Sequence, residues 1–286
     1  MACATNEPTT GNRGVLGVFD SGVGGLSVVR HLLLQYPEQS ILYVADQAHA
    51  PYGERPLSEI RRLASGITRF LLSQGAHLIV IACNTASAAA LHELRGAFPE
   101  VPFVGMEPAL MPAAERTRLR RVGIVATAAT FQGELFASLL DRYGNGIEVR
   151  TQVCPDWVRL VEAGDISSPR AREAVERCLE PLLSAGIDEL VLGCTHYPFL
   201  RPLIEHVVGL GVEVIDPAPA VARQAGRVLS RQQMPADEAS PPTRTFFTTG
   251  DRLPFQRALC ALLGQAIPAQ QASWQANGDL VALTFG

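Results

Sequence analysis

Short apolar runs alternate with longer amphipathic segments along most of this 286-residue chain. The apolar runs are rich in Val, Ile and Leu, which is typical of strands that are buried on both faces. They occupy residues 14–19, 41–45, 78–82, 101–104, 121–126, 148–153, 189–192 and 212–215. The amphipathic segments predict helices at residues 26–35, 57–74, 86–98, 131–143, 170–185, 200–208 and 218–230. This alternation predicts the α/β class, with parallel sheets covered by helices on both faces.

The pattern occurs twice along the chain. Residues 78–110 and 189–221 each run from an apolar strand through a cysteine and a polar pair to a helix, a second strand, an acidic residue and Pro-Ala. We infer two similar parallel-sheet domains related by pseudo-twofold symmetry, with an active site in the cleft between them. The alternative is the general likeness that all α/β repeats share.

The domain boundaries follow from the repeat. We predict a first domain at residues 14–106 plus 222–286 and a second domain at residues 107–221. Residues 1–13 form a leader that we expect to be disordered. A polar, Pro-containing loop at residues 231–245 precedes a late strand, so we expect the C-terminal segment to return to the first domain.

Composition excludes several classes of function. Hydrophobic residues make up 47% of the chain and charged residues 18%, which describes a globular protein. The formal charge of −4 argues against a nucleic-acid-binding face. The first residues do not resemble a signal peptide, and no apolar run approaches the roughly 20 residues that span a bilayer. We therefore predict a cytoplasmic protein without a membrane partner.

Lysine is absent, because all 24 basic residues are arginine. Codon bias is a sufficient origin for this composition, but the chemical consequence holds in any case. Without an amine side chain the protein forms no Schiff base with pyridoxal phosphate, and it has no Walker A lysine. Pyridoxal-phosphate catalysis and a Walker A nucleotide site are therefore excluded.

Two of the cysteines occupy positions that favour chemistry. Cys83 and Cys194 each lie between the end of a predicted strand and the start of a helix, where ligands of open α/β sheets bind. A helix N-terminus favours a thiolate, so we expect lowered thiol pKa values and a role as nucleophile or base. If the two halves face each other, a carbon acid between the thiols loses a proton to one and gains a proton from the other, as stereoinversion requires.

The other cysteines have simpler expected roles. For Cys154, Cys178 and Cys260 we expect the commoner state of a buried, inert thiol. We expect no disulfide in a reducing compartment. No CxxC pair occurs, so we predict no metal site.

A glycine-rich turn follows the first predicted strand, from Asp20 to Leu26. It resembles a phosphate-binding loop, but it does not fit GxGxxG, and Asp20 would repel a phosphate. We expect Asp20 to orient or deprotonate Cys83 or to hold a substrate ammonium group. Capping of the helix at Leu26 is the simpler alternative, and the two roles are compatible.

Further polar residues lie near the predicted strand ends. His196 is a candidate proton partner for Cys194, with a partly buried structural histidine as the alternative. Glu162 is a weaker candidate, because a glutamate near a helix end is usually solvated. Hydroxyls, an amide and backbone N–H groups that suit a carboxylate come from Asn84, Thr85, Thr195 and the turn Pro51-Tyr52-Gly53, which is otherwise an ordinary loop.

Several of these motifs match a known family. FDSGVGGLSV at residues 19–28, PYG at 51–53, ACNTASA at 82–88, EPA at 107–109 and GCTHYP at 193–198 resemble glutamate racemases of the cofactor-independent aspartate/glutamate racemase superfamily. CPDWVRLVEAG and FFTTGD fit more loosely. The resemblance covers roughly residues 14–251.

The resemblance implies cofactor-independent interconversion of L- and D-glutamate, which supplies D-glutamate for peptidoglycan. It implies that Cys83 takes the α-proton from the D-enantiomer and Cys194 from the L-enantiomer. Asp20 would assist Cys83, and His196 with Glu162 would assist Cys194. The substrate contacts that carry over are Asp20, Ser21, Tyr52, Gly53, Asn84, Thr85, Thr195 and His196. A homodimer is the expected assembly, and some family members with leaders respond to a UDP-sugar cell-wall precursor, UDP-N-acetylmuramoyl-alanine.

Three other functions stay open at this stage. One is another enzyme of the superfamily, such as an aspartate racemase or a thiol-dependent isomerase or decarboxylase. A second is an amino-acid-binding regulator that needs neither thiol. The third is a nucleotide-binding protein built on the glycine-rich turn.

Overall fold

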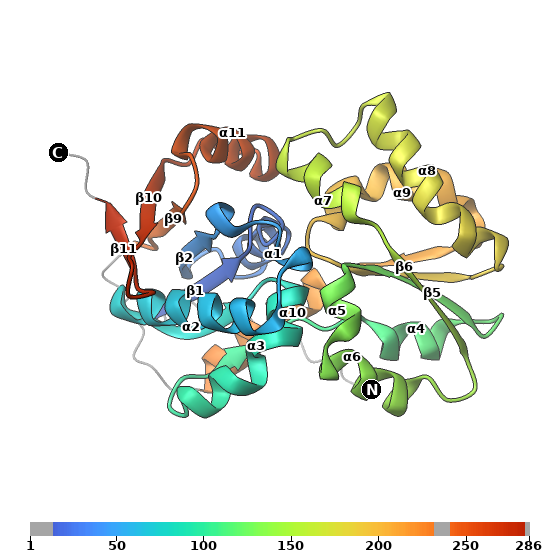
Figure 1. Ribbon diagram of the computed structural model, residues 1–286, viewed down its shortest axis with the longest axis horizontal. Helices are drawn as coiled ribbons and strands as arrows, with labels where there is room; N and C mark the ends of the chain where they lie inside the picture. The colour runs from blue at the N-terminus through green and yellow to red at the C-terminus, as the bar shows by residue number, and fades with distance from the viewer. Residues whose placement is uncertain (1–13, 232–240, 284–286) are drawn as a thin grey trace, which may run out of the picture.

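The computed structural model describes residues 14–231 and 241–283. The predicted leader at residues 1–13 and part of the predicted loop at residues 231–245 lie outside the described residues. The chain forms two lobes that lie side by side along the long axis of the molecule, each built around its own sheet (Figure 1). This confirms the predicted α/β class, while the boundaries of the two domains stay a prediction.

The first lobe holds a seven-stranded sheet with the order β11-β10-β9-β2-β1-β3-β4. Its strands are parallel except β11, which pairs antiparallel with β10. Their bounds are β1 Val15–Asp20, β2 Ser40–Ala45, β3 Ala76–Ile81, β4 Phe103–Val104, β9 Arg244–Thr248, β10 Ala269–Trp274 and β11 Leu280–Leu283.

The second lobe holds a four-stranded parallel sheet with the order β6-β5-β7-β8. Its strands are β5 Arg121–Ala126, β6 Glu148–Val153, β7 Glu189–Gly193 and β8 Glu213–Ile215. The order repeats that of β2-β1-β3-β4, in agreement with the duplication inferred from the sequence. Cys83 follows β3 and Cys194 follows β7, so the two thiols leave topologically equivalent strands.

Helices cover the sheets, as the amphipathic segments predict. The first lobe carries α1 Leu26–Gln35, α2 Leu57–Ser73, α3 Asn84–Ala97, α10 Ala218–Arg231 and α11 Arg252–Leu263. The second lobe carries α4 Leu110–Arg116, α5 Ala128–Gln132, α6 Glu134–Tyr143, α7 Pro155–Glu162, α8 Pro169–Ser184 and α9 Arg201–Val208. Among the described residues, no helix has the length and apolar character needed to cross a membrane.

One predicted helix, at residues 131–143, is divided in the structure. Gly133 adopts an extended backbone, with φ −73° and ψ 145°, and separates α5 from α6. A Cβ on Gly133 would lie 2.8 Å from the Cβ of Ala88, so the break brings the chain against α3 of the other lobe. The helices α4, α7 and α11 were not among the predicted elements.

The C-terminal segment adds strands to the sheet of the first lobe. β9 pairs with β2, and β10 and β11 extend the same sheet outward to its edge (Figure 1). Phe246 and Phe247 of β9 are buried on opposite faces of the sheet. The ring of Phe247 packs edge-on against Phe70 of α2 at a centroid distance of 5.1 Å.

The expectations for three cysteines are wrong in part. Cys154 and Cys178 form a disulfide that joins the residue before α7 to α8. Their Cα atoms lie 6.0 Å apart because α7 packs on α8, where the indole of Trp157 donates to the carbonyl of Ala174. Cys260 is exposed on α11 rather than buried.

Truncation of Phe247 tests how strongly the C-terminal segment supports the first lobe. Phe247→Ala removes a ring that is 2% exposed, so we expect a loss of about 3–5 kcal/mol in the free energy of unfolding, measured by urea denaturation. Leu253→Ala, at a side chain that is 63% exposed, should change it by less than about 0.5 kcal/mol. Equal effects of the two variants would contradict this packing.

Candidate active site

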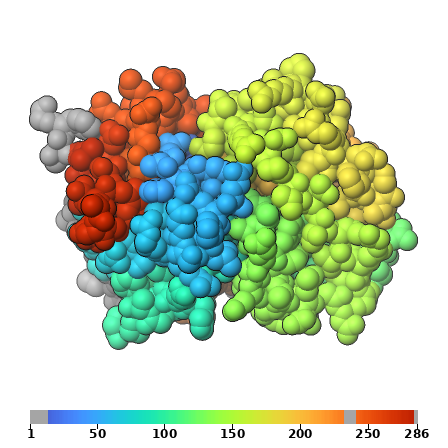
Figure 2. Space-filling view, viewed as in Figure 1, coloured from blue at the N-terminus to red at the C-terminus, as the bar shows by residue number. Residues whose placement is uncertain are grey.

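The two sequence-predicted thiols lie where the lobes meet. Cys83 is the N-cap residue of α3, and its Sγ accepts a hydrogen bond from the backbone N–H of Ala86 at 3.4 Å. Cys194 lies directly after β7. The side chains are 4% and 7% exposed, and the charge of Cys194 acts on Cys83. On the face shown in Figure 2, the two lobes press together. Both thiols are buried.

Asp20 ends β1 and is fully buried between the lobes. Its Oδ1 accepts from the Ser21 hydroxyl at 2.9 Å and from the Gly22 N–H at 3.0 Å. Its Oδ2 accepts from the hydroxyl of Thr195 in the second lobe at 2.7 Å. Burial raises the pKa of Asp20 above its ordinary value, although these bonds and the charge of His196 oppose the shift. Asp20 does not cap α1, which begins after Gly25.

The expectation of a lowered pKa is wrong for Cys83. Burial raises the pKa of this thiol, and the negative charge of Asp20 raises it further. The N–H of Ala86 at the start of α3 favours the thiolate, as the sequence argument requires, but its effect is smaller. The position at a helix N-terminus therefore does not by itself activate Cys83, and the thiol depends on groups around it to lose its proton.

Cys194, His196 and Glu162 form a relay. The Sγ of Cys194 lies 3.7 Å from Nδ1 of His196, and Nε2 of His196 lies 2.6 Å from Oε1 of Glu162. Burial lowers the pKa of His196, but the hydrogen bonds to Cys194 and Glu162 outweigh it and hold that pKa well above its ordinary value. Burial raises the pKa of Glu162, but the bond from His196 outweighs it and holds that pKa below its ordinary value. The pair is therefore an imidazolium and a carboxylate.

Glu162 also joins the lobes, so it is not the solvated helix-end residue that was its simpler interpretation. It ends α7, and its side chain is 20% exposed. Its Oε1 accepts from the backbone N–H of Val23 at 2.8 Å, and its Oε2 accepts from the Gln47 amide at 2.9 Å. One carboxylate thus binds His196 and two groups of the first lobe.

The glycine-rich turn owes its composition to this close approach. A Cβ on Gly22 would collide with the Glu162 carboxylate, and a Cβ on Gly24 would collide with the imidazole of His196. The turn therefore lets the acid–base groups of the second lobe reach the first, which explains the glycines without a phosphate ligand.

The remaining predicted contact residues lie around the same centre. Asn84 is 2% exposed, and neither polar atom of its amide has a hydrogen-bond partner among the described residues. Such orphaned groups are costly and rare in folded proteins, so the amide is free to bind a polar ligand. The Thr85 hydroxyl lies 2.8 Å from that of Thr127 in the second lobe. A Cβ on Gly53 would lie 2.8 Å from the Cβ of Thr127.

Tyr52 is arranged differently from the other contact residues. Its side chain is 1% exposed, and its hydroxyl donates to Oδ2 of Asp46 at 2.7 Å. The hydroxyl already has a partner, so we expect any contact of Tyr52 with a ligand to come from its backbone.

Two residues of the site were missed from the sequence. Gln47 donates to Glu162 and accepts from the Thr248 hydroxyl at 2.9 Å. Tyr43 donates from its hydroxyl to the carbonyl of Gly22 at 2.7 Å. Gln47 lies just beyond the carboxyl end of β2, and the rule that ligands bind beyond strand ends points to it. Tyr43 lies within β2 and carries no comparable signal.

Comparisons with known proteins agree with this geometry. The Asp/Glu/Hydantoin racemase family model matches residues 25–225. The glutamate racemase of Ectopseudomonas mendocina is 48% identical over 250 residues, which cover 87% of this chain and 95% of the relative. The glutamate racemase of Pseudomonas aeruginosa is 49% identical over 249 residues, which cover 87% of this chain and 94% of the relative.

Solved structures share the fold. Glutamate racemase isoform RacE1 of Bacillus anthracis matches with a TM-score of 0.81 and 32% identity, over 92% of this chain and 97% of that one. Escherichia coli glutamate racemase, solved with L-glutamate and the activator UDP-MurNAc-ala, matches with a TM-score of 0.81 and 29% identity, over 94% of this chain and 99% of that one. Together with the paired thiols, these matches show that the chain belongs to the Asp/Glu/hydantoin racemase family, among the glutamate racemases.

Proposed function

We propose that this protein interconverts L- and D-glutamate by proton transfer between two thiols, without a cofactor. The observation that supports the proposal most strongly is the placement of Cys83 and Cys194 after equivalent strands of two facing sheets, each beside its own acid–base partner. An α-carbon between two such groups has one on each face. A decarboxylase that works with a single thiol has no use for a second thiol and its acid–base partner.

The proposed reaction needs one thiolate and one thiol at the start. From D-glutamate, Cys83 accepts the α-proton and Cys194 donates a proton to the opposite face, which gives L-glutamate. The reverse reaction exchanges the two roles. Asp20, whose pKa is raised by burial, takes up the proton that Cys83 must lose to become a base. His196, held as an imidazolium by Glu162, stabilises the thiolate of Cys194.

The substrate carboxylates and ammonium group require partners other than lysine. The unpaired amide of Asn84 and the hydroxyl of Thr85 supply polar groups for these contacts. The hydroxyls of Thr195 and Ser21 donate to Asp20, so each must exchange that bond for one to the substrate. Before it takes up the proton of Cys83, Asp20 offers a buried negative charge to the ammonium group. The backbone N–H groups of the turn at Tyr52 and Gly53 complete the proposed set of contacts. The biological setting that we propose is the supply of D-glutamate for peptidoglycan in the cytoplasm, by a homodimer.

A regulatory ligand is part of the proposal. The Escherichia coli relative was solved with an activator, UDP-MurNAc-ala. Here a pocket of about 690 Å³ between α4 and α10 is lined by Arg116, Arg201, Arg223 and Arg227, together with Glu107, Glu213 and Asp216. Guanidinium groups in this number suit a diphosphate, although Arg116 is already paired with Glu213 at 2.8 Å.

Added UDP-N-acetylmuramoyl-alanine should therefore raise kcat/KM for glutamate, as measured by circular dichroism of the substrate. Arg223→Gln and Arg227→Gln should weaken this activation and leave the basal rate unchanged. An unchanged rate at saturating concentrations of the UDP-sugar would remove activation from the proposal.

The racemisation itself is tested in D₂O. Incubation of the purified protein with L-glutamate, with no cofactor added, should abolish the optical signal and the α-proton signal together, because the product receives deuterium from a thiol. Cys83→Ala and Cys194→Ala should each lower racemisation by about 10²–10⁴-fold, the usual contribution of a general acid or base. Cys260→Ala, at the exposed cysteine of α11, is the matched control and should keep full activity.

Near-wild-type turnover in either active-site variant would disprove the two-thiol scheme. Racemisation of aspartate but not glutamate would favour the related racemases. Binding of glutamate without loss of the α-proton would favour a regulator.

The pH dependence should report the Glu162–His196 pair. We expect a bell-shaped pH–rate profile, because one thiol must be charged and the other protonated. Glu162 raises the pKa of His196, so Glu162→Gln should lower that pKa. Because the imidazolium is the active form and is lost as pH rises, the alkaline limb of the kcat profile should move to lower pH. Glu205→Gln, at a half-exposed residue of α9, should leave the profile unchanged. An unmoved limb in Glu162→Gln would contradict the relay.

A further inference from the structure

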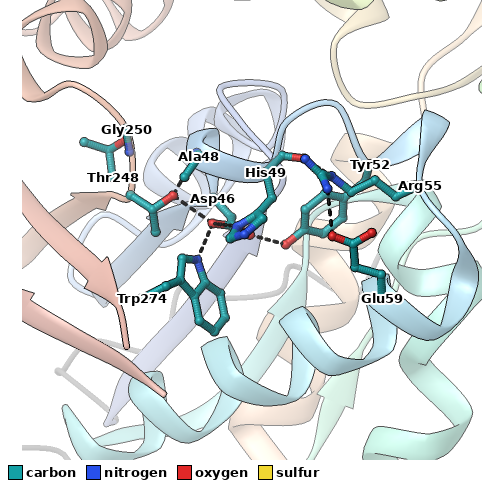
Figure 3. Close-up of polar contacts among 10 residues, drawn as sticks. Asp46, Ala48, His49, Tyr52, Arg55, Glu59, Thr248, Gly250 and Trp274 are labelled. Atoms are coloured by element: carbon teal, nitrogen blue, oxygen red, sulfur yellow. Dashed lines mark hydrogen bonds and ion pairs between the residues drawn. The ribbon is translucent and has the colours of Figure 1, made fainter. Parts of the chain in front are cut away.

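A second buried carboxylate lies in the first lobe, and the proton-transfer scheme does not use it. Asp46 directly follows β2 and is 0% exposed. Figure 3 shows side chains from several segments converging on it. Oδ1 accepts from the indole N–H of Trp274 and from the hydroxyl of Thr249, each at 2.7 Å. Oδ2 accepts from the Tyr52 hydroxyl at 2.7 Å, and Nδ1 of His49 lies 3.1 Å from both oxygens.

The four contacts keep the carboxylate charged. Burial raises the pKa of Asp46, but the bonds from His49, Tyr52 and Trp274 outweigh burial and hold that pKa below its ordinary value. A buried charge is costly unless its acceptor positions are filled by donors. The loss of one donor would therefore destabilise the buried carboxylate and, with it, its bonds to the remaining donors. Asp46 is therefore a rigid joint between β2, the turn after β9 and strand β10.

The joint fixes the segment that reaches the second lobe. Tyr52 opens the short helix Tyr52–Glu54, and its ring is held by the bond to Asp46. The next residue, Gly53, lies against Thr127, and Glu54 pairs with Arg159 of α7 at 2.6 Å. The segment is thus anchored to Asp46 at one end and to the second lobe at the other.

We propose that Asp46 is a positioning residue for the reaction: it holds the Tyr52–Gly53 backbone where it meets the substrate, and it does so with support from Trp274 of the C-terminal hairpin. The proposal rests on the proposed racemisation and on the contact of this turn with glutamate. Asp46 itself touches no thiol in the described structure. The hairpin β10–β11 would then be part of the machinery for substrate binding, although it lies at the far edge of the sheet (Figure 1).

A purely structural role would look different in kinetics. If Asp46 only joined the hairpin to the sheet, its loss would lower the melting temperature or the fraction of folded enzyme, and therefore the apparent kcat, with no change in KM. A positioning role predicts weaker binding of glutamate in enzyme that is still folded. The split between KM and kcat separates the two roles.

Two variants test the proposal from opposite ends of one hydrogen bond. Asp46→Asn should raise KM for L- and D-glutamate by about tenfold or more and change kcat by less than about threefold, in line with the loss of bonds to a charged group. Trp274→Phe removes one donor and keeps a ring over Gly66, so KM should rise by about three- to tenfold. The matched control is Asn277→Ala in the same hairpin, which removes two exposed bonds to Asp279 and should leave KM unchanged.

Amide hydrogen exchange supplies a readout that does not depend on turnover. In Trp274→Phe, the amides of residues 47–54 should exchange faster than in the wild type, while those of β3 stay protected. If Asp46→Asn does not fold, Trp274→Phe alone decides.

Folded variants with wild-type KM and wild-type exchange at residues 47–54 would overturn the proposal. A wild-type protein that does not racemise glutamate would instead overturn the proposed function. In that case, faster exchange in Trp274→Phe would still show that Asp46 and Trp274 hold residues 47–54 in place.

Discussion

A buried carboxylate shared between two lobes is the interaction on which the site depends. Asp20 ends β1, an inner strand of the first sheet, and it binds Thr195, which lies just beyond β7 of the second sheet. The carboxyl ends of both sheets are thereby brought face to face, with a thiol from each. Such proximity is possible only because the turn after Asp20 has no side chains at positions 22 and 24, where Glu162 and His196 press in. Glycine is required at these positions because a Cβ would collide with Glu162 or His196, and not because the backbone adopts an unusual conformation.

The duplicated architecture carries chemistry that is not duplicated. The two sheets share one strand order, and the thiols follow matching strands. Cys83, however, has a carboxylate as its neighbour, whereas Cys194 has an imidazolium held by a second carboxylate. One partner opposes the thiolate by charge and the other favours it. In the proposed reaction, which needs one thiolate and one thiol, this inequality would select which thiol starts as the base in the free protein.

The sequence predicts what depends on local pattern and misses what depends on contacts over long separations. Strands such as β1 and β5 are evident because burial on both faces leaves apolar runs. The paired cysteines are evident because each strand ends at one. The role of Glu162 in joining the lobes is not visible in the sequence, because its partners Val23 and Gln47 lie more than 100 residues away in the chain. The raised pKa of Cys83 is hidden for the same reason, because burial is a property of the packed lobes. The Cys154–Cys178 disulfide likewise arises from the packing of α7 on α8.

The burial of both thiols has a consequence for the fate of the abstracted hydrogen. In the proposed reaction, a proton taken from the α-carbon would rest on a sulfur that bulk water scarcely reaches, because Cys83 is 4% exposed and Cys194 is 7% exposed. While the lobes stay closed, that proton can return to the carbanion or pass to Asp20 or His196, which are themselves buried. Internal return therefore competes with inversion, and isotope enters the unreacted enantiomer more slowly than it enters the product. The hydrogen bonds that join the lobes would thus determine how often the abstracted proton exchanges with solvent before it is returned to the carbanion.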